Sequence, residues 1–430
     1  MKAKKILTAI LAAAFVFTCG CTKSETAAPT AAPTSSTAAE TSADTSETLA
    51  DEEIAALDEH QTILNNSFVQ FGNTYRIVKK LRQMMAGEET VIAYIGGSIT
   101  YGVGADSETC YAKRSFDYLA EEYGKGDNVK YVNAGISGTP SILGNLRVKR
   151  DVLNYDADIV FIEFAVNDGG EKLYQESYDS MVHTILEQEN EPAVILLFNR
   201  TKEGHSAQDY MKQIGEYYEL PMVSSADALT IELDAGRMTW EDYSNDSSHP
   251  NAEGHKLVAE MLDNYFETLK YRSMVDTEYK LKPIGKFNAP YKNAVLAEAD
   301  YDNSDEHIQI TDIGPFDKAA QGTFGFTKGW AYDPDSEGGA FKATVTGNNL
   351  FLICKRNNSD SMGKIEVYID GERAKIIDTN DADGWGDPYA YQVIKWQSVK
   401  TMEVEVRIAE GSEDKTVEIL GIAASANETF

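Results

Sequence analysis

Short, predominantly apolar runs alternate with amphipathic segments through the middle of the chain, and small or polar residues follow each run. The clearest runs span residues 90–95, 158–164 and 193–198, and shorter ones span 129–132 and 222–223. A segment that is apolar on both faces is typical of a parallel strand that helices cover on both sides. The sequence therefore predicts a doubly wound α/β domain built on a parallel sheet.

Two of the segments between these runs have the periodicity of amphipathic helices. Apolar residues recur every three or four positions along one face of each segment. The two faces consist of Ala112, Phe116, Leu119 and Tyr123, and of Leu257, Val258, Met261, Leu262 and Tyr265. Because strands alternate with helices, we expect the α/β domain to fill residues 51–280, with its chemistry at the carboxyl ends of the strands.

The C-terminal part of the chain changes to strict alternation of apolar and polar residues. Residues 365–369 and 402–408 show this period of two, and Asp370-Gly371 ends the first of them as a hairpin signal. We predict an all-β sandwich domain over residues 285–430, possessing either an accessory or a carbohydrate-binding role. The boundary is expected in residues 279–291, which contain two prolines and a glycine.

The N-terminus has the features of a bacterial secretory signal. Three lysines precede an apolar run at residues 6–17, which is too short to span a bilayer. The run is followed by Gly20-Cys21, which resembles the lipidation site of a bacterial lipoprotein signal. We expect residues 1–21 to be the signal peptide and lipid on Cys21 to hold the protein on the extracellular face of the bacterial cell membrane. The alternative is a cleaved, freely secreted protein.

The segment after this site is rich in Ser, Thr, Ala, Glu and Pro. Such a composition cannot bury a core, so residues 22–50 are expected to form a flexible tether. Beyond the anchor, the mature chain contains only Cys110 and Cys354, which we place in different domains. Neither a disulfide framework nor a metal site is therefore predicted.

The charge of the chain narrows the range of partners. Against 39 Lys and Arg residues the chain has 69 Asp and Glu residues, for a formal net charge of −30. Such a surface repels phosphate backbones, which excludes nucleic acid as a partner and favours neutral or cationic substrates. Solubility of a secreted protein explains the sign of the charge equally well.

Four polar segments that could carry chemistry lie at the ends of the predicted elements. Residues 96–102 (GGSITYG) follow the first strand, and on their own they are weak evidence, since plain turns use the same residues. No Walker lysine or GxGxxG pattern accompanies them. The other segments are 133–140 (NAGISGTP), 163–168 (EFAVND) and 246–250 (DSSHP).

In this order and on this fold, the four segments resemble the SGNH, or GDSL-type, hydrolase superfamily. The resemblance covers residues 73–269 and implies a flavodoxin-like sheet and ester hydrolysis without metal or cofactor. It implies that Ser98 is the nucleophile, that His249 is its base and that Asp246 orients the imidazole. It also implies an oxyanion hole formed by the Ser98 N–H, the Gly138 N–H and the Asn167 side-chain amide.

The chain departs from the family pattern at two positions. Gly97 stands where the family usually has Asp, and the resulting Gly-Gly-Ser-Ile-Thr resembles a branch rich in predicted carbohydrate esterases; weakened chemistry is the alternative. Ala165 replaces the first Gly of the usual Gly-x-Asn-Asp. Asp168 either shapes the Asn167 loop or acts directly.

Three other residues near these segments have plain structural explanations. His255 lies inside the last predicted helix, so we interpret it as structural. Arg147 and Arg150 either face a substrate or pair with nearby carboxylates, and the second interpretation is favoured.

Taken together, these features favour an esterase that removes O-acetyl groups from polysaccharide. Four aromatic residues of the C-terminal region could offer faces for sugar stacking, although burial in the sandwich is the default explanation. They are Trp330, Trp385, Tyr389 and Tyr391. The alternatives are a lipase or thioesterase of the same superfamily, and a catalytically silent glycan-binding lipoprotein.

Overall fold

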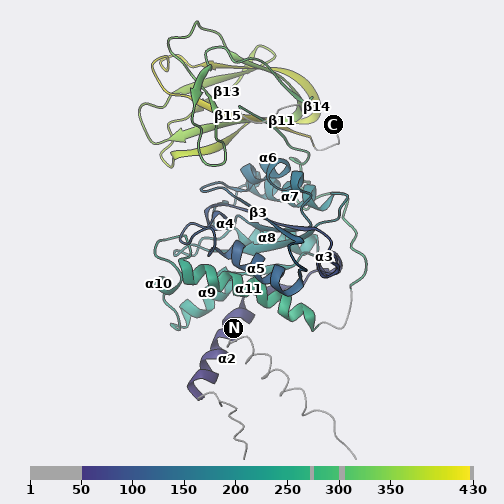
Figure 1. The fold of residues 1–430 in the computed structure, drawn as a ribbon. Coiled ribbons are helices and arrows are strands. Elements are labelled where there is room, and N and C mark those ends of the chain that lie inside the picture. Colours follow the sequence, from purple (N-terminus) through teal and green to yellow (C-terminus); the bar gives the residue numbers. More distant parts are fainter. Residues whose placement is uncertain (1–50, 272–275, 300–305, 427–430) are drawn as a thin grey trace, which may run out of the picture. The chain divides into compact units, whose positions relative to one another are not determined.

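The computed structural model describes residues 51–271, 276–299 and 306–426 (Figure 1). The expected signal peptide with Cys21 and the expected tether at 22–50 lie outside the described residues, so these predictions stay open. Within the described ranges no helix is long and apolar enough to cross a membrane.

Six strands form the first sheet, in the order β1-β6-β5-β4-β2-β3. Their bounds are Phe68–Gln70 (β1), Thr90–Gly96 (β2), Val129–Gly135 (β3), Ile159–Glu163 (β4), Ala193–Phe198 (β5) and Met222–Ser224 (β6). Every neighbouring pair is parallel except β1 and β6. The predicted α/β fold with a flavodoxin-like sheet is confirmed. The sequence does not reveal β1, because three half-buried residues show no period.

Helices cover both faces of this sheet. One face carries α3 (Tyr75–Ala86), α5 (Tyr111–Tyr123), α9 (Ser225–Asp234) and α11 (Ala252–Lys270), and the other carries α6 (Ser141–Asp151), α7 (Lys172–Leu186) and α8 (Gln208–Tyr217). The shorter or peripheral helices are α2 (Asp51–Asn66), α4 (Ser98–Tyr101), α10 (Trp240–Tyr243) and the 3-10 turn η1 (Leu153–Tyr155).

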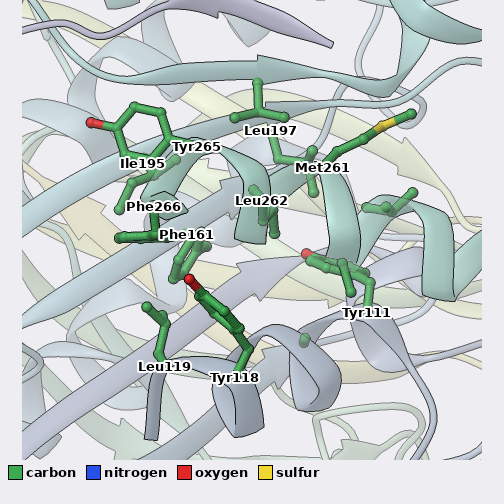
Figure 2. Close-up of a cluster of buried hydrophobic side chains, with 14 of the residues drawn as sticks. Tyr111, Tyr118, Leu119, Phe161, Ile195, Leu197, Met261, Leu262, Tyr265 and Phe266 are labelled. Atoms are coloured by element: carbon green, nitrogen blue, oxygen red, sulfur yellow. The ribbon is translucent and has the colours of Figure 1, made fainter. Parts of the chain in front are cut away.

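Successive residues of each strand contribute to opposite cores, as the period of a strand requires. On β4, Phe161 belongs to the core under α11, whereas Val160 belongs to the core under α7 and α8. Figure 2 shows the first of these cores, where Phe161 and Ile195 lie near Leu262 and Phe266 of α11. Both predicted amphipathic helices contribute their apolar faces to it.

The strand order positions the candidate site. The chain passes from β2 to β3 on one side and then crosses to β4 on the other side of β2. In α/β sheets, ligands bind at such a switch point, outside the carboxyl ends of the strands. Gly96 pairs with Gly135 and with Glu163, so the loops that carry three of the predicted motifs leave the sheet side by side.

The C-terminal region forms a nine-stranded sheet, and all its pairs are antiparallel. Its strands are β7 (Val295–Glu298), β8 (Ile308–Asp312), β9 (Lys318–Ala320), β10 (Gly329–Ala331), β11 (Phe341–Asn357), β12 (Lys364–Ile369), β13 (Glu372–Asp378), β14 (Trp385–Ile408) and β15 (Glu418–Ser425). The predicted all-β class is confirmed. Asp370 and Gly371 turn between β12 and β13 with φ of 51° and 83°, the conformation of a two-residue hairpin turn.

Apolar contacts join α6 to the β-rich region. Ile142 and Leu146 of α6 share a buried cluster with Tyr291, Phe351 and Leu420. The predicted boundary segment is held as well, because Asp179 of α7 accepts hydrogen bonds from the backbone N–H groups of residues 286, 287 and 289. The two regions therefore share a core rather than being joined by a free linker.

Candidate active site

The residue predicted to be the nucleophile lies in a tight turn after β2. Ser98 opens the one-turn helix α4 and is 8% exposed. Gly96 makes the turn possible, because a Cβ atom there would lie 2.0 Å from the Thr100 hydroxyl and 2.5 Å from the Glu163 carbonyl oxygen. The small residues before the serine therefore allow the turn to pack directly on β4.

The predicted base and its orienting carboxylate come from one loop. His249 Nε2 lies 2.9 Å from Ser98 Oγ, and His249 Nδ1 lies 2.8 Å from Asp246 Oδ2. With its Nδ1 proton donated to Asp246, the imidazole leaves Nε2 free to accept the serine proton. The structure thus brings all three residues together, in the order that proton transfer requires.

The shape of this loop is fixed by its own hydrogen bonds. Asp246 Oδ1 accepts from the backbone N–H groups of Ser248 and His249, both at 2.7 Å. The Ser244 hydroxyl donates to the His249 carbonyl oxygen at 2.6 Å. Partial burial opposes ionisation of Asp246, but these N–H groups and the imidazole hold its pKa below the usual value. Asp246 is therefore a carboxylate throughout the neutral range.

Asn167 explains the departure from the family pattern at position 97. A Cβ atom on Gly97 would lie 2.2 Å from Asn167 Oδ1 and 2.9 Å from its Cγ. The Asn167 amide thus occupies the space that a side chain at 97 would need. The structure places the predicted amide donor directly against the nucleophile turn.

Gly138, the other predicted donor, touches an aromatic side chain from the β-rich region. Gly138 has φ of +72°, and a Cβ atom there would lie 2.6 Å from Cζ2 of Trp385. Trp385 is 49% exposed, and its ring lies 5.3 Å from that of Phe324, which is 46% exposed. Trp330 and Tyr391, by contrast, pack against the core of the β-rich region. Sequence alone does not distinguish Trp385 from the aromatic residues that pack on this core.

Two buried carboxyl groups lie beneath the site. Burial raises the pKa of Glu163, at the end of β4, to about 7, against the opposing effect of the nearby Asn199 and Thr100 side chains. Burial likewise raises the pKa of Asp168 to about 7. The signal for Glu163 is present in the sequence, since it is the one ionisable residue in an otherwise apolar strand.

Three other residues have structural positions. His255 accepts from the Tyr111 N–H and donates to the Val103 carbonyl oxygen, which ties α11 to the segment that follows the nucleophile turn. The fully buried Arg147 donates to the carbonyl oxygens of Gly96 and Ala134 and pairs with Asp151. Arg150 pairs with carboxylates too, on Asp151 and on Glu298 of β7. In the part of the chain that the structure describes, no three His, Cys, Asp or Glu residues form a group that could hold a metal ion.

Comparisons with known proteins concern the family and the fold of the chain. Residues 94–257 match the model of the GDSL-like Lipase/Acylhydrolase family, a span that includes all five predicted site residues. The resemblance to this superfamily is thereby confirmed over residues 94–257. A search of curated proteins finds no match to the chain.

Solved structures extend the likeness beyond the α/β region. A two-domain esterase active on acetylated mannans, solved alone and with mannopentaose, is 26% identical with a TM-score of 0.73. The alignment covers 85% of this chain and 99% of that esterase. An acetylxylan esterase from Geobacillus stearothermophilus is 22% identical over 44% of this chain and 100% of its own, with a TM-score of 0.34. The mannan esterase therefore shares the two-region architecture.

Proposed function

We propose that this chain is a serine esterase that removes O-acetyl groups from polysaccharide, since residues 94–257 match the GDSL-like Lipase/Acylhydrolase family. The observation that carries the proposal is the hydrogen-bond chain from Asp246 through His249 to Ser98, with separations of 2.8 and 2.9 Å. These distances allow proton transfer without rearrangement of the side chains.

In the first half of the reaction, Ser98 Oγ attacks the acetyl carbonyl carbon while His249 Nε2 takes the hydroxyl proton. The carbonyl oxygen becomes an oxyanion, which the N–H groups of Ser98 and Gly138 and the Asn167 amide stabilise. One such donor is typically worth about 3 kcal/mol in the transition state. The bond to the sugar oxygen then breaks, and His249 gives its proton to the leaving alcohol.

In the second half, water attacks the acetyl-Ser98 ester and His249 takes a proton from that water. The tetrahedral intermediate releases acetate, and the proton returns to Ser98. Asp246 stays ionised and stabilises the imidazolium at each step.

A carbohydrate substrate is supported by the surroundings of Gly138. Trp385 and Phe324 present half-exposed aromatic faces beside this donor, and aromatic faces suit the apolar C–H surface of a sugar ring. The mannan esterase is similar over both regions, so acetylated mannan is our first candidate. Acetate release from acetylated mannan, xylan, pectin and peptidoglycan, measured side by side, tests this choice; faster release from another glycan rejects mannan. A preference for long-chain esters over p-nitrophenyl acetate would instead indicate a lipase.

We further propose that Cys21 carries a lipid and that the enzyme works on the cell surface. The support is the sequence pattern around Gly20-Cys21 alone. We expect the producing bacterium to incorporate labelled fatty acid into the wild-type protein but not into the Cys21→Ala variant. Unlabelled protein released to the medium would identify a freely secreted enzyme.

The nucleophile assignment is tested with a serine-directed phosphonate and p-nitrophenyl acetate. Ser98→Ala should remove essentially all turnover while the melting temperature stays the same, and the phosphonate should label only the peptide that contains Ser98. Ser107→Ala is the matched control, because Ser107 is an exposed serine of the loop after α4 and should leave turnover intact. Labelling elsewhere, or turnover by Ser98→Ala, would refute the assignment.

A further inference from the structure

Asp168 is almost completely buried, with 1% of its surface exposed, and both of its carboxyl oxygens are used. Oδ1 accepts a hydrogen bond from the backbone N–H of Ser141 at 2.7 Å. Oδ2 accepts one from the hydroxyl of Tyr210, on α8, at 2.6 Å. The carboxyl group therefore joins the loop after β4 to two helices.

One of these bonds ends at the loop that carries Gly138. Ser141 is the first residue of α6, and the chain runs from Gly138 to it in three steps. Pro140 holds the N-cap position, and its side chain makes no capping hydrogen bond to α6. Asp168 supplies the capping acceptor from outside the helix. The N–H groups of the first turn have no acceptor within the helix, so they favour a group that can carry negative charge.

The other end of the connection is equally well fixed. Asp168 follows Asn167 directly, and its backbone N–H donates to the Phe164 carbonyl oxygen at 3.1 Å. Its own carbonyl oxygen accepts from Nε2 of His205 at 3.0 Å. The backbone around the Asn167 amide is thus held from two sides, and the Asp168 side chain extends this hold to α6.

We propose that Asp168 is a positioning residue that holds the Asn167 and Gly138 loops at a fixed separation, so that their two donors meet on one oxyanion. The inference rests on the proposed function. Without the side-chain link, the Gly138 loop would keep its anchor at Ile136 N–H to Gly96 O, 3.1 Å, but lose the one at the start of α6. A shift of about 1 Å in such a donor can reduce the rate by about 100-fold.

A second buried aspartate provides a matched control. Asp179 of α7 also accepts from a tyrosine hydroxyl, that of Tyr218 at 2.8 Å, and from backbone N–H groups, including Phe287 at 2.7 Å. It holds the boundary segment, and the loops of the predicted oxyanion donors do not contact it through any of these bonds. Asp179→Ala therefore reports what loss of a buried aspartate side chain does to stability alone.

The experiment compares kcat and KM for p-nitrophenyl acetate, and the affinity of phenylboronic acid, whose adduct with a serine mimics the oxyanion. Asp168→Ala removes both side-chain hydrogen bonds, and we expect its kcat/KM to fall by about 30-fold through kcat, with KM within about three-fold of wild type. The boronic acid should bind more weakly by a similar factor. Asp179→Ala should lower the melting temperature but keep kcat within about two-fold.

Tyr210→Phe supplies a second, milder variant, which removes one bond to Asp168 and should reduce kcat by about three-fold. It decides the matter if Asp168→Ala does not fold. Wild-type kcat and boronic acid affinity in Asp168→Ala, or in Tyr210→Phe when the first variant is unfolded, would overturn this inference alone. An equal loss of kcat in Asp179→Ala would also overturn it. Wild-type protein without turnover would overturn the proposed function and this inference with it.

Discussion

Replacement of Gly97 by alanine tests the most specific feature of the candidate site. The added methyl would lie 2.2 Å from Asn167 Oδ1, whereas ordinary contacts begin near 3.4 Å. The Asn167 side chain must therefore retreat by about 1 Å or the nucleophile turn must move by the same amount. The proposed role of Asn167 is to donate a hydrogen bond to the oxyanion. Either shift should therefore destabilise the transition state more than the ground state.

The size of the effect follows from two general magnitudes. Loss of one oxyanion donor typically costs about 100- to 1000-fold in kcat, and a misplacement of about 1 Å costs about 100-fold. We therefore expect Gly97→Ala to reduce kcat for p-nitrophenyl acetate by about 100-fold, with a small change in KM. Gly338→Ala is the control, because a Cβ atom there meets nothing within 4 Å.

A double-mutant cycle separates this explanation from general damage to the turn. Asn167→Ala should itself reduce kcat by about 100-fold, but it also removes the atoms that a methyl at 97 would meet. In the Asn167→Ala background, Gly97→Ala should therefore reduce kcat only slightly further. If kcat falls by the full factor of about 100 there as well, the steric argument is wrong.

Three further outcomes follow from the buried and exposed groups near the site. Burial raises the pKa of Glu163 from 4.5 to about 7, so its protonated form stabilises the fold below pH 4.5, and this contribution should be lost as the pH rises to 7. In urea titrations, the free energy of unfolding of Glu163→Gln relative to wild type should therefore rise by roughly 3 kcal/mol over this pH range. A constant difference between the two proteins would contradict this prediction. Trp385→Ala should reduce activity on acetylated mannan by about ten-fold but activity on p-nitrophenyl acetate by less than about three-fold. Equal losses on the two substrates would argue against a sugar contact. A chain ending at Lys280 should be poorly soluble, because it exposes the apolar face of α6 that packs on Tyr291 and Phe351, and a soluble, fully active truncation would show that this contact is dispensable.

The parts of the fold that sequence predicts are those with a strong local signal. The runs at 90–95 and 193–198 appear as β2 and β5 with almost the expected bounds, because their residues are buried on both faces. The hairpin at Asp370-Gly371 is likewise a local feature. Strand order and the short edge strand β1 depend on pairings distant in the chain, so no local pattern reveals them.

For the candidate site, the motifs identify the residues but not how they hold one another. The short Asp246–His249 spacing predicts that one loop supplies both side chains, and the structure brings them to Ser98. The links from Asp168 to Ser141 and from Trp385 to Gly138 span 27 and more than 200 positions. Contacts of this kind are set by packing between layers, and a single sequence contains no signal for them.

At position 97, the sequence identifies an unusual residue and the structure explains it. The sequence shows only that a glycine stands where the resembled family usually has an aspartate, and we interpret it as subfamily identity, with weakened chemistry as the alternative. The structure gives the physical reason for the glycine, since the Asn167 amide fills the space beside it. In this geometry, Gly97→Asp should reduce kcat at least as much as Gly97→Ala does, because the carboxylate adds bulk and negative charge beside the proposed oxyanion hole. A fully active Gly97→Asp variant would show that the turn accepts the usual family residue, and that the close approach of Asn167 is not needed for turnover.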